Sequence, residues 1–180
     1  MWSLPLVRFQ NNAHVLLKLQ HIYKNSWYKD INRIGTSGNG NKLRVYNKFK
    51  DTFQLEKYLM AIKNKSSRAN ICNLRISSHK LEVEQGRYKR PKVDYDDRIC
   101  RFCKTHVENE YHFLLQCGLY HEVRQNFLKL LLQIMPNFLS LSDKDKFLLL
   151  ISCSDNELIF MLSKYIDKCV QMRNDSLPSS

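Results

Sequence analysis

The chain of 180 residues has no long apolar run, and it contains only five glycines and four prolines. Its most apolar stretch, residues 127–141, is interrupted by Lys129, Gln133, Pro136 and Asn137, so it is too short and too polar to span a bilayer. The first twenty residues mix apolar side chains with charged and amide ones and contain no small-residue cleavage site, so we expect no secretory signal. We therefore expect an intracellular protein, nuclear or cytoplasmic, with no membrane partner.

Motifs of catalysis are also scarce. Three of the glycines fall in residues 35–41, but they lack the spacing of a phosphate-binding loop. The triplet Tyr95-Asp96-Asp97 is similar to the Tyr-x-Asp-Asp box of polymerases, yet it is one residue short and lies in an expected loop. We therefore expect no enzymatic activity and no small-molecule substrate.

Acidic residues are few relative to basic ones, 17 against 29, which gives a formal net charge of +12. The excess is confined to the first part of the chain. Residues 1–104 have a net charge of +14, whereas residues 105–180 have a net charge of −2. A basic part of this kind favours polyanionic partners such as RNA or DNA, and the near-neutral part is expected to pack or assemble.

Apolar spacing along the chain predicts a mainly α protein: a small helical domain with an embedded zinc-knuckle-like Cys-Cys-His-Cys module and C-terminal helices. Ser142 and the pair Ser154/Glu157 have the positions of helix N-caps, and Pro136 should end the helix before it. The expected segments are an N-terminal helical segment (1–34), a Gly-rich linker (35–41), a basic helical segment and connector (42–99), the zinc module (100–118), C-terminal helices (119–173) and a frayed tail (174–180). Within the third of these, we expect the connector at 79–99 to be extended.

Four residues have the spacing of a metal site: Cys100-x2-Cys103-x8-His112-x4-Cys117. Two cysteines separated by two residues can turn both sulfur atoms toward one point, and the eight-residue gap lets the chain reverse. In a reducing compartment such cysteines are more often metal ligands than disulfides. Three thiolates and one imidazole suit a single structural Zn²⁺ with a closed shell of four ligands.

The identity of the imidazole ligand remains open at the level of sequence. His106 lies inside the gap and His121 lies one turn after the last cysteine, so either could replace the predicted histidine. The other cysteines, Cys72, Cys153 and Cys169, have apolar neighbours, and we expect them to be small buried side chains.

Cationic and aromatic side chains surround the first half of this motif. Cations neutralise phosphates and aromatic rings stack on exposed bases, so the pattern is typical of a surface that binds single-stranded or irregular RNA. The alternative is a solvated basic linker, screened in part by the acidic residues at 94–97. The predicted nucleic-acid-binding residues are Arg87, Tyr88, Lys89, Arg90, Lys92, Arg98, Arg101 and Lys104.

Several segments in the same order resemble the C-terminal region of non-LTR (LINE-type) retrotransposon reverse transcriptases. They are residues 42–50 (KLRVYNKFK), 74–88 (LRISSHKLEVEQGRY), 98–103 (RICRFC) and 110–117 (EYHFLLQC), and the resemblance covers roughly residues 27–130. It implies a helical segment followed by a zinc module that binds the element's RNA or its target DNA during target-primed reverse transcription. The metal ligands it implies are Cys100, Cys103, His112 and Cys117.

In that family the polymerase and endonuclease domains lie upstream, and this chain has neither, so the resemblance does not imply catalysis here. Two other hypotheses remain at this stage. The chain could be a helical protein-interaction module in which residues 119–173 bind a partner, or a non-functional retrotransposon remnant.

Overall fold

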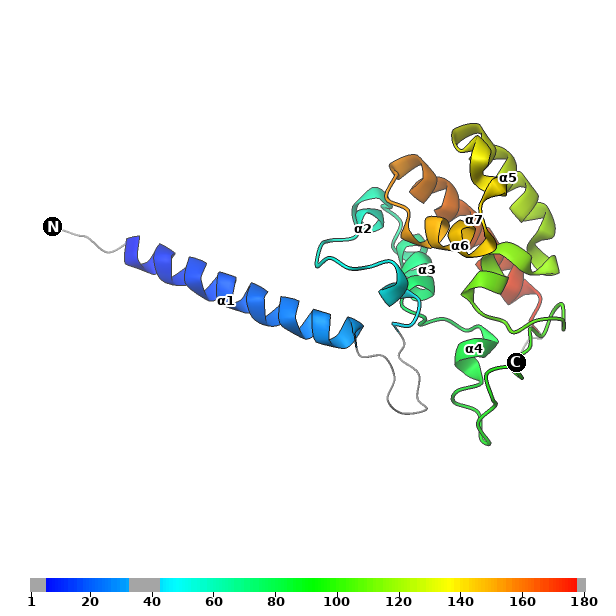
Figure 1. Cartoon of the computed structure of the whole chain (residues 1–180), viewed down its shortest axis with the longest axis horizontal. Helices are drawn as coiled ribbons and strands as arrows, with labels where there is room; N and C mark the ends of the chain where they lie inside the picture. Colours follow the sequence, from blue (N-terminus) through cyan, green and yellow to red (C-terminus); the bar gives the residue numbers. More distant parts are fainter. Residues whose placement is uncertain (1–5, 33–42, 178–180) are drawn as a thin grey trace. The chain divides into compact units, whose positions relative to one another are not determined.

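The computed structural model describes the backbone of residues 6–32 and 43–177, and the side chains of the same ranges except residues 6–12. The chain divides into two compact units, residues 1–41 with 51–54 and residues 42–50 with 55–180 (Figure 1). All regular elements in the described ranges are helices, which confirms the predicted mainly α fold. The predicted linker at 35–41 lies outside the described residues.

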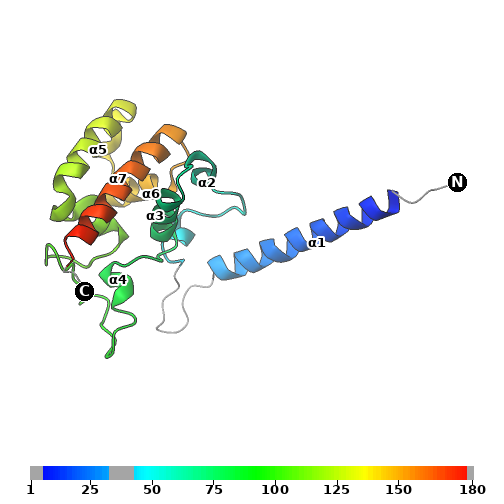
Figure 2. The ribbon, with the colours of Figure 1, turned by 180° about the vertical axis from the view of Figure 1, so that it is seen from behind.

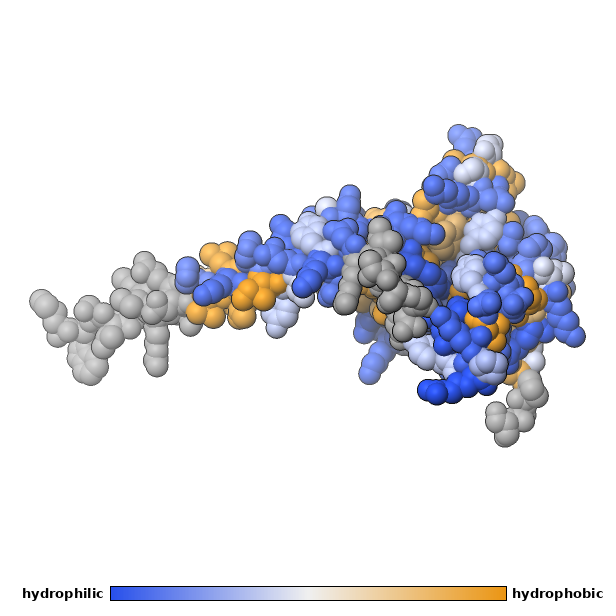
Figure 3. All heavy atoms as spheres, turned by 60° about the horizontal axis from the view of Figure 1, so that its bottom comes forward, coloured by the Kyte–Doolittle hydropathy of each residue, from blue (hydrophilic) through white to orange (hydrophobic). Residues whose placement is uncertain are grey.

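The first unit is built on a single long helix, α1 (Leu6–Ile31), where a helical segment was predicted. Near its end the ring of Trp27 packs edge-on against Tyr28, with ring centroids 4.9 Å apart, and against Phe53 at 5.7 Å. Apolar side chains earlier in the helix, among them Leu16 and Ile22, are exposed, and Figure 3 shows apolar surface along this helix. None of the described helices combines the length and the hydropathy needed to cross a membrane.

The second unit is arranged around the long helix α7 (Asn156–Asp175), which packs against α3 (Lys65–Arg75), α5 (His121–Ile134) and α2 (Lys57–Ala61). Figures 1 and 2 show α7 between α3 on one side and α5 on the other. The shorter elements are η1 (Tyr46–Lys48), α4 (Glu82–Gln85), η2 (His112–Gln116), η3 (Gly118–Tyr120), η4 (Pro136–Ser140) and α6 (Asp143–Ser152).

One apolar core connects the C-terminal helices to the cysteine segment. On α7, Leu162 and Ile166 are fully buried, and the ring of Tyr165 stacks on Phe127 of α5 with centroids 4.7 Å apart. The hydroxyl of Tyr165 donates a hydrogen bond of 2.6 Å to the carbonyl of Leu114, inside the predicted metal motif. The helices after residue 119 therefore form the support on which this motif rests, because their apolar faces are used within the chain.

Helix ends follow the predicted capping chemistry in most places. The Ser142 hydroxyl accepts a hydrogen bond from the Asp145 amide at the start of α6, and α5 ends before Pro136, both as predicted. The predicted cap at Ser154 is wrong. Asp155 is the N-cap of α7, and its carboxylate accepts from the Leu158 amide at 2.9 Å. A carboxylate can accept a hydrogen bond from the helix N-terminus as a hydroxyl does, and it also interacts favourably with the helix dipole.

Three other expectations about segments need correction. The connector at 79–99 was expected to be extended, but it contains the short helix α4. The first two amides of this helix donate to Glu108: the Glu82 amide to the carboxylate at 2.8 Å, and the Val83 amide to the backbone carbonyl at 3.1 Å. Those acceptors come from a distant segment, so local sequence does not reveal them. Between residues 42 and 62 only η1 and α2 are helical, both shorter than expected. The helix α7 continues through Asp175, where a frayed tail was expected.

Candidate metal centre and the adjoining basic surface

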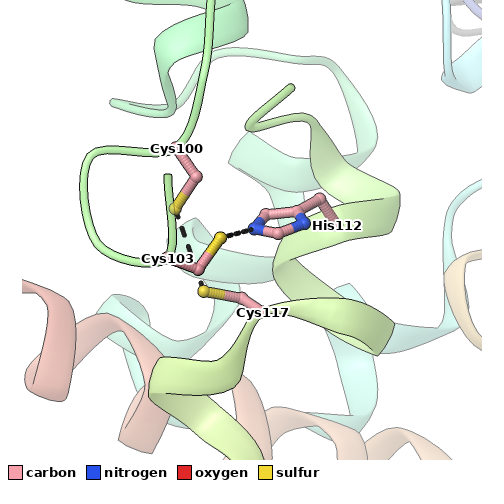
Figure 4. A group of neighbouring side chains, drawn as sticks. All are labelled: Cys100, Cys103, His112 and Cys117. Carbon is pink, nitrogen blue, oxygen red and sulfur yellow. Dashed lines mark hydrogen bonds between the residues drawn. The ribbon is translucent and has the colours of Figure 1, made fainter. Parts of the chain in front are cut away.

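The four predicted ligands meet at one point, and their ligand atoms all lie within 4.8 Å of one another (Figure 4). The Sγ atoms of Cys100 and Cys117 are 3.9 Å apart, and Cys103 Sγ lies 3.3 Å from His112 Nε2. Tetrahedral zinc with ordinary bond lengths would place two sulfurs about 3.8 Å apart and a sulfur about 3.6 Å from a nitrogen. The arrangement therefore fits a four-coordinate metal ion with little movement of the side chains.

Backbone hydrogen bonds bend the first half of the site into a tight loop. The Cys100 amide donates to the His106 carbonyl and the Lys104 amide donates to the Cys100 carbonyl, both at 2.9 Å. An isolated bridge between Ile99 and Val107 closes the base of the loop. Lys104 has a φ of 56°, in the left-handed region, which turns the chain sharply directly after Cys103.

The second half of the site depends on a π turn. In an α-helix, residues five apart point about 140° away from each other, so His112 and Cys117 would diverge. Instead the Cys117 amide donates to the His112 carbonyl at 2.8 Å, an i→i+5 bond that places the two residues one turn apart. The Asn109 side chain accepts from the His112 amide at 2.8 Å and fixes the start of this turn.

The structure selects His112 over the two alternative histidines. Its Nε2 atom faces Cys103, and its ring is buried. His106 is exposed and its Nδ1 lies 2.8 Å from the Thr105 hydroxyl, while His121 is exposed at the start of α5. Neither belongs to the group of converging ligand atoms.

The hydrogen bond between Cys100 and Cys117 shifts the pKa values of the two thiols in opposite directions. The hydrogen bond with Cys117, together with burial, raises the pKa of Cys100 to about 12, and the same bond lowers the pKa of Cys117. Burial lowers the pKa of His112, but the hydrogen bonds and charges of Cys100 and Cys103 outweigh burial and raise that pKa. A bound cation would have to displace these protons, so metal binding should release protons and weaken at acidic pH.

A buried ion pair joins the metal loop to the end of α7. Glu108 Oε1 accepts from the Cys100 thiol at 3.6 Å, and the Glu108 carboxylate is bound by both terminal nitrogens of Arg173. The Arg173 guanidinium also lies over the ring of Phe102, 5.0 Å from its centroid, between the first two cysteines. Arg173 thus neutralises the buried carboxylate that accepts the hydrogen bond of the Cys100 thiol.

Two buried carboxylates of α4 organise the predicted basic surface. Glu82 binds both Lys89, at 2.9 Å, and Arg101, whose Nε donates at 2.9 Å. Arg87 is instead drawn onto Glu84, at 3.1 Å, together with Arg44. Lys89 and Arg101 keep 50% and 45% of their side chains exposed, whereas Arg87 keeps 14%, so the first two face solvent much more than the third.

Arg98 is not part of that surface. It is buried, and its guanidinium donates to the carbonyls of Val83, at 2.7 Å, and Val93, at 2.9 and 3.0 Å. It therefore joins α4 to the loop before the metal site instead of facing a ligand. The other predicted contact residues are exposed: Tyr88, Arg90, Lys92 and Lys104.

The buried acids hold the basic side chains in place, and the sequence pattern does not reveal this role. Besides Glu82, Glu84 and Glu108, Glu110 accepts hydrogen bonds from the Ser77 hydroxyl at 2.6 Å and from Arg44 at 2.6 Å. Burial alone would raise the pKa of Glu110, but its partners, His79 first among them, lower it to about 2. The only trace in the sequence is a repeated Glu-x-Glu at 82–84 and 108–110, a pattern that is common on solvated surfaces.

Comparison of the chain with protein-family models, with curated proteins and with solved structures finds no match. The function must therefore be argued from the residues of the site.

Proposed function

We propose that this chain is a non-enzymatic module, folded around one structural zinc ion, that binds single-stranded nucleic acid, with RNA as the preferred class. The observation on which the proposal depends is that Lys89 and Arg101 converge on the single carboxylate of Glu82 beside the metal loop. Two cations on one anion leave a net positive charge at a fixed place on the surface.

Zinc is the metal that the donor set favours. Three thiolates and an imidazole select soft or borderline metals, and a closed tetrahedral shell of these donors is typical of structural zinc sites. The four ligands would use every coordination position, so no position remains for a reacting water. In this proposal zinc contributes by folding residues 99–117, since binding energy at such a site is folding energy.

Nucleic acid is the partner that best fits the adjoining surface. Lys89 and Arg101 are positioned by Glu82 and remain about half exposed, so each can contact a phosphate without a large loss of side-chain entropy. Tyr88, which is 66% exposed, precedes Lys89 and offers a flat ring to an unstacked base.

The test combines metal analysis with RNA binding by the zinc-loaded full chain. We expect one zinc per chain, lost in Cys100→Ser and retained in Cys153→Ser. We expect the affinity for single-stranded RNA to fall as the salt concentration rises. Lys89→Ala and Arg101→Ala are made singly, so that Glu82 keeps one partner. Each should reduce the slope of log affinity against log salt concentration by about 0.7. Lys129→Ala, an exposed lysine on α5, is the matched control and should not change the slope.

Two outcomes would refute parts of this proposal. A well-folded chain that holds no zinc would remove the metal centre. A zinc-loaded chain that binds neither RNA nor DNA at low salt would remove the nucleic-acid function. That second result would favour the protein-interaction hypothesis, for which the relevant surface is the pair Leu130 and Ile134, one turn apart on α5 and 52% and 41% exposed.

A further inference from the structure

A hollow of about 250 Å³ lies between α3, the end of α7 and the segment 78–81. Its apolar lining includes Leu74, Leu81 and Phe113, all buried. Its polar lining includes three asparagines from two helices, Asn70, Asn73 and Asn174. A pocket of this size is below the roughly 300 Å³ at which sites for drug-sized ligands begin, so it suits a small planar group.

The three asparagine side chains differ in whether they already form a hydrogen bond within the chain. The side-chain nitrogen of Asn70 donates to Asp167 at 2.7 Å, which fixes that residue. The side-chain amides of Asn73 and Asn174 have no hydrogen-bond partner within the described ranges. Each of these two therefore offers a donor and an acceptor next to an apolar lining, which is the combination that recognises the edge of a heterocycle.

A second hollow, of about 160 Å³, borders this pocket on the side of the proposed nucleic-acid surface. The two hollows share Ser78, His79 and Lys80, and the second one extends to Tyr88. Lys80 is exposed where the two meet. The chain at 80–82 is itself anchored, because Arg173 donates to the Lys80 carbonyl at 3.0 Å and Glu108 accepts from the Glu82 amide.

We propose that the pocket between α3 and α7 takes one unstacked adenine base of the single-stranded RNA, with Asn73 and Asn174 hydrogen-bonded to its edge. Lys80 contacts a phosphate near that base, and Tyr88 stacks on a base further along the strand. Adenine is the base chosen because an asparagine amide pairs in bidentate fashion with its N6 and N7 atoms. This inference rests on the proposed nucleic-acid function and adds a base preference to it.

The experiment measures binding of eight-nucleotide oligo-adenylate and oligo-uridylate RNA to the zinc-loaded full chain by fluorescence anisotropy. Asn73→Ala and Asn174→Ala are compared with Asn126→Ala, an exposed amide on α5 outside both hollows. We expect each pocket variant to weaken oligo-adenylate binding about tenfold, near the low end for a bidentate amide–base pair, and to change oligo-uridylate binding less than about twofold. The control should leave both unchanged.

A second readout does not depend on the basic surface. Adenosine 5′-monophosphate is titrated into ¹⁵N-labelled protein, and we expect the side-chain amide signals of Asn73 and Asn174 to shift while that of Asn126 stays in place. If both RNAs bind but the pocket variants weaken them equally or not at all, the base pocket is wrong while the nucleic-acid function stands. Absence of any shift with the nucleotide also overturns the pocket. If the parent chain binds neither RNA, the proposed function itself fails, and this inference with it.

Discussion

Replacing Gly86 with alanine should strain the packing between α4 and the loop that leads to the metal site. A Cβ atom at position 86 would lie 2.7 Å from Cγ, 2.8 Å from Cδ and 2.9 Å from Nε of Arg98. All three distances are shorter than real carbon contacts, so one of the two residues must move. Arg98 has little freedom to move, because its guanidinium donates to the carbonyls of Val83 and Val93 in a buried position.

The size of the effect follows from these contacts. Overpacking in a well-packed region costs about 1–3 kcal/mol, and each hydrogen bond lost from a charged group costs about 1.5–3 kcal/mol. Alanine reduces the entropy of the unfolded chain, which gives back about 0.4–1 kcal/mol because Gly86 already has a right-handed helical conformation. We therefore expect Gly86→Ala to lower the free energy of unfolding by about 2 kcal/mol.

The assay is urea unfolding of the chain in the presence of zinc, monitored by circular dichroism, with Gly118→Ala as the matched control. A Cβ atom at Gly118 meets nothing within 4 Å, so that variant should be as stable as the parent or slightly more stable. In the double variant Gly86→Ala/Arg98→Ala the two effects should be less than additive, because the second change removes the obstacle. A Gly86→Ala protein as stable as Gly118→Ala would refute the close packing of Arg98 against α4.

Three further predictions concern stability. Burial raises the pKa of Glu56, but its basic partners outweigh burial and lower that pKa below the ordinary value of 4.5. The ionised carboxylate therefore stabilises the fold above pH 4.5, and this stabilisation is lost as the pH falls further. Between pH 5 and 3, the free energy of unfolding should therefore fall less in Glu56→Gln than in the parent chain. Arg173→Ala leaves Glu108 buried without its cation and should cost about 3–5 kcal/mol in urea unfolding, part of which Glu108→Gln in the same chain should restore. Asp155→Ala should lower thermal stability by about 1 kcal/mol and Ser154→Ala should not, because Asp155 is the cap; the opposite order would contradict this assignment.

The convergence of the candidate metal ligands could be predicted from the sequence because the motif is local. Cys100, Cys103, His112 and Cys117 fall within eighteen residues, and their spacing alone limits how they can meet. The histidine was less certain, since choosing among three candidates required the π turn at 112–116, which no propensity rule anticipates. The turn becomes evident only when the Cys117 amide is seen to bind the His112 carbonyl instead of the carbonyl four residues back.

Helices were predicted well where they are long and poorly where other segments stabilise them. The helix predicted at 119–135 corresponds to α5, and the helix that Ser154 and Glu157 were predicted to open, running through Cys169, corresponds to α7. Each presents an apolar face with a helical period. The four-residue helix α4 has no such pattern. Its first two amides are satisfied by Glu108, which is more than twenty residues away in the sequence, so the helix exists only in the folded chain.

The basic surface shows why net charge is a weak guide to a binding site. The sequence did not distinguish among the seven cationic residues around the motif, but the fold separates them by their contacts with buried groups. Arg98 donates hydrogen bonds to buried backbone carbonyls, and Arg87 forms an ion pair with Glu84. Lys89 and Arg101 both pair with Glu82 and stay about half exposed. Since one carboxylate cannot neutralise two cations, the surplus charge is concentrated where these two side chains meet. The buried acids therefore decide where positive charge is exposed on this surface, and a change at Glu82 should alter the positions of the exposed cationic side chains more than a change at any single lysine.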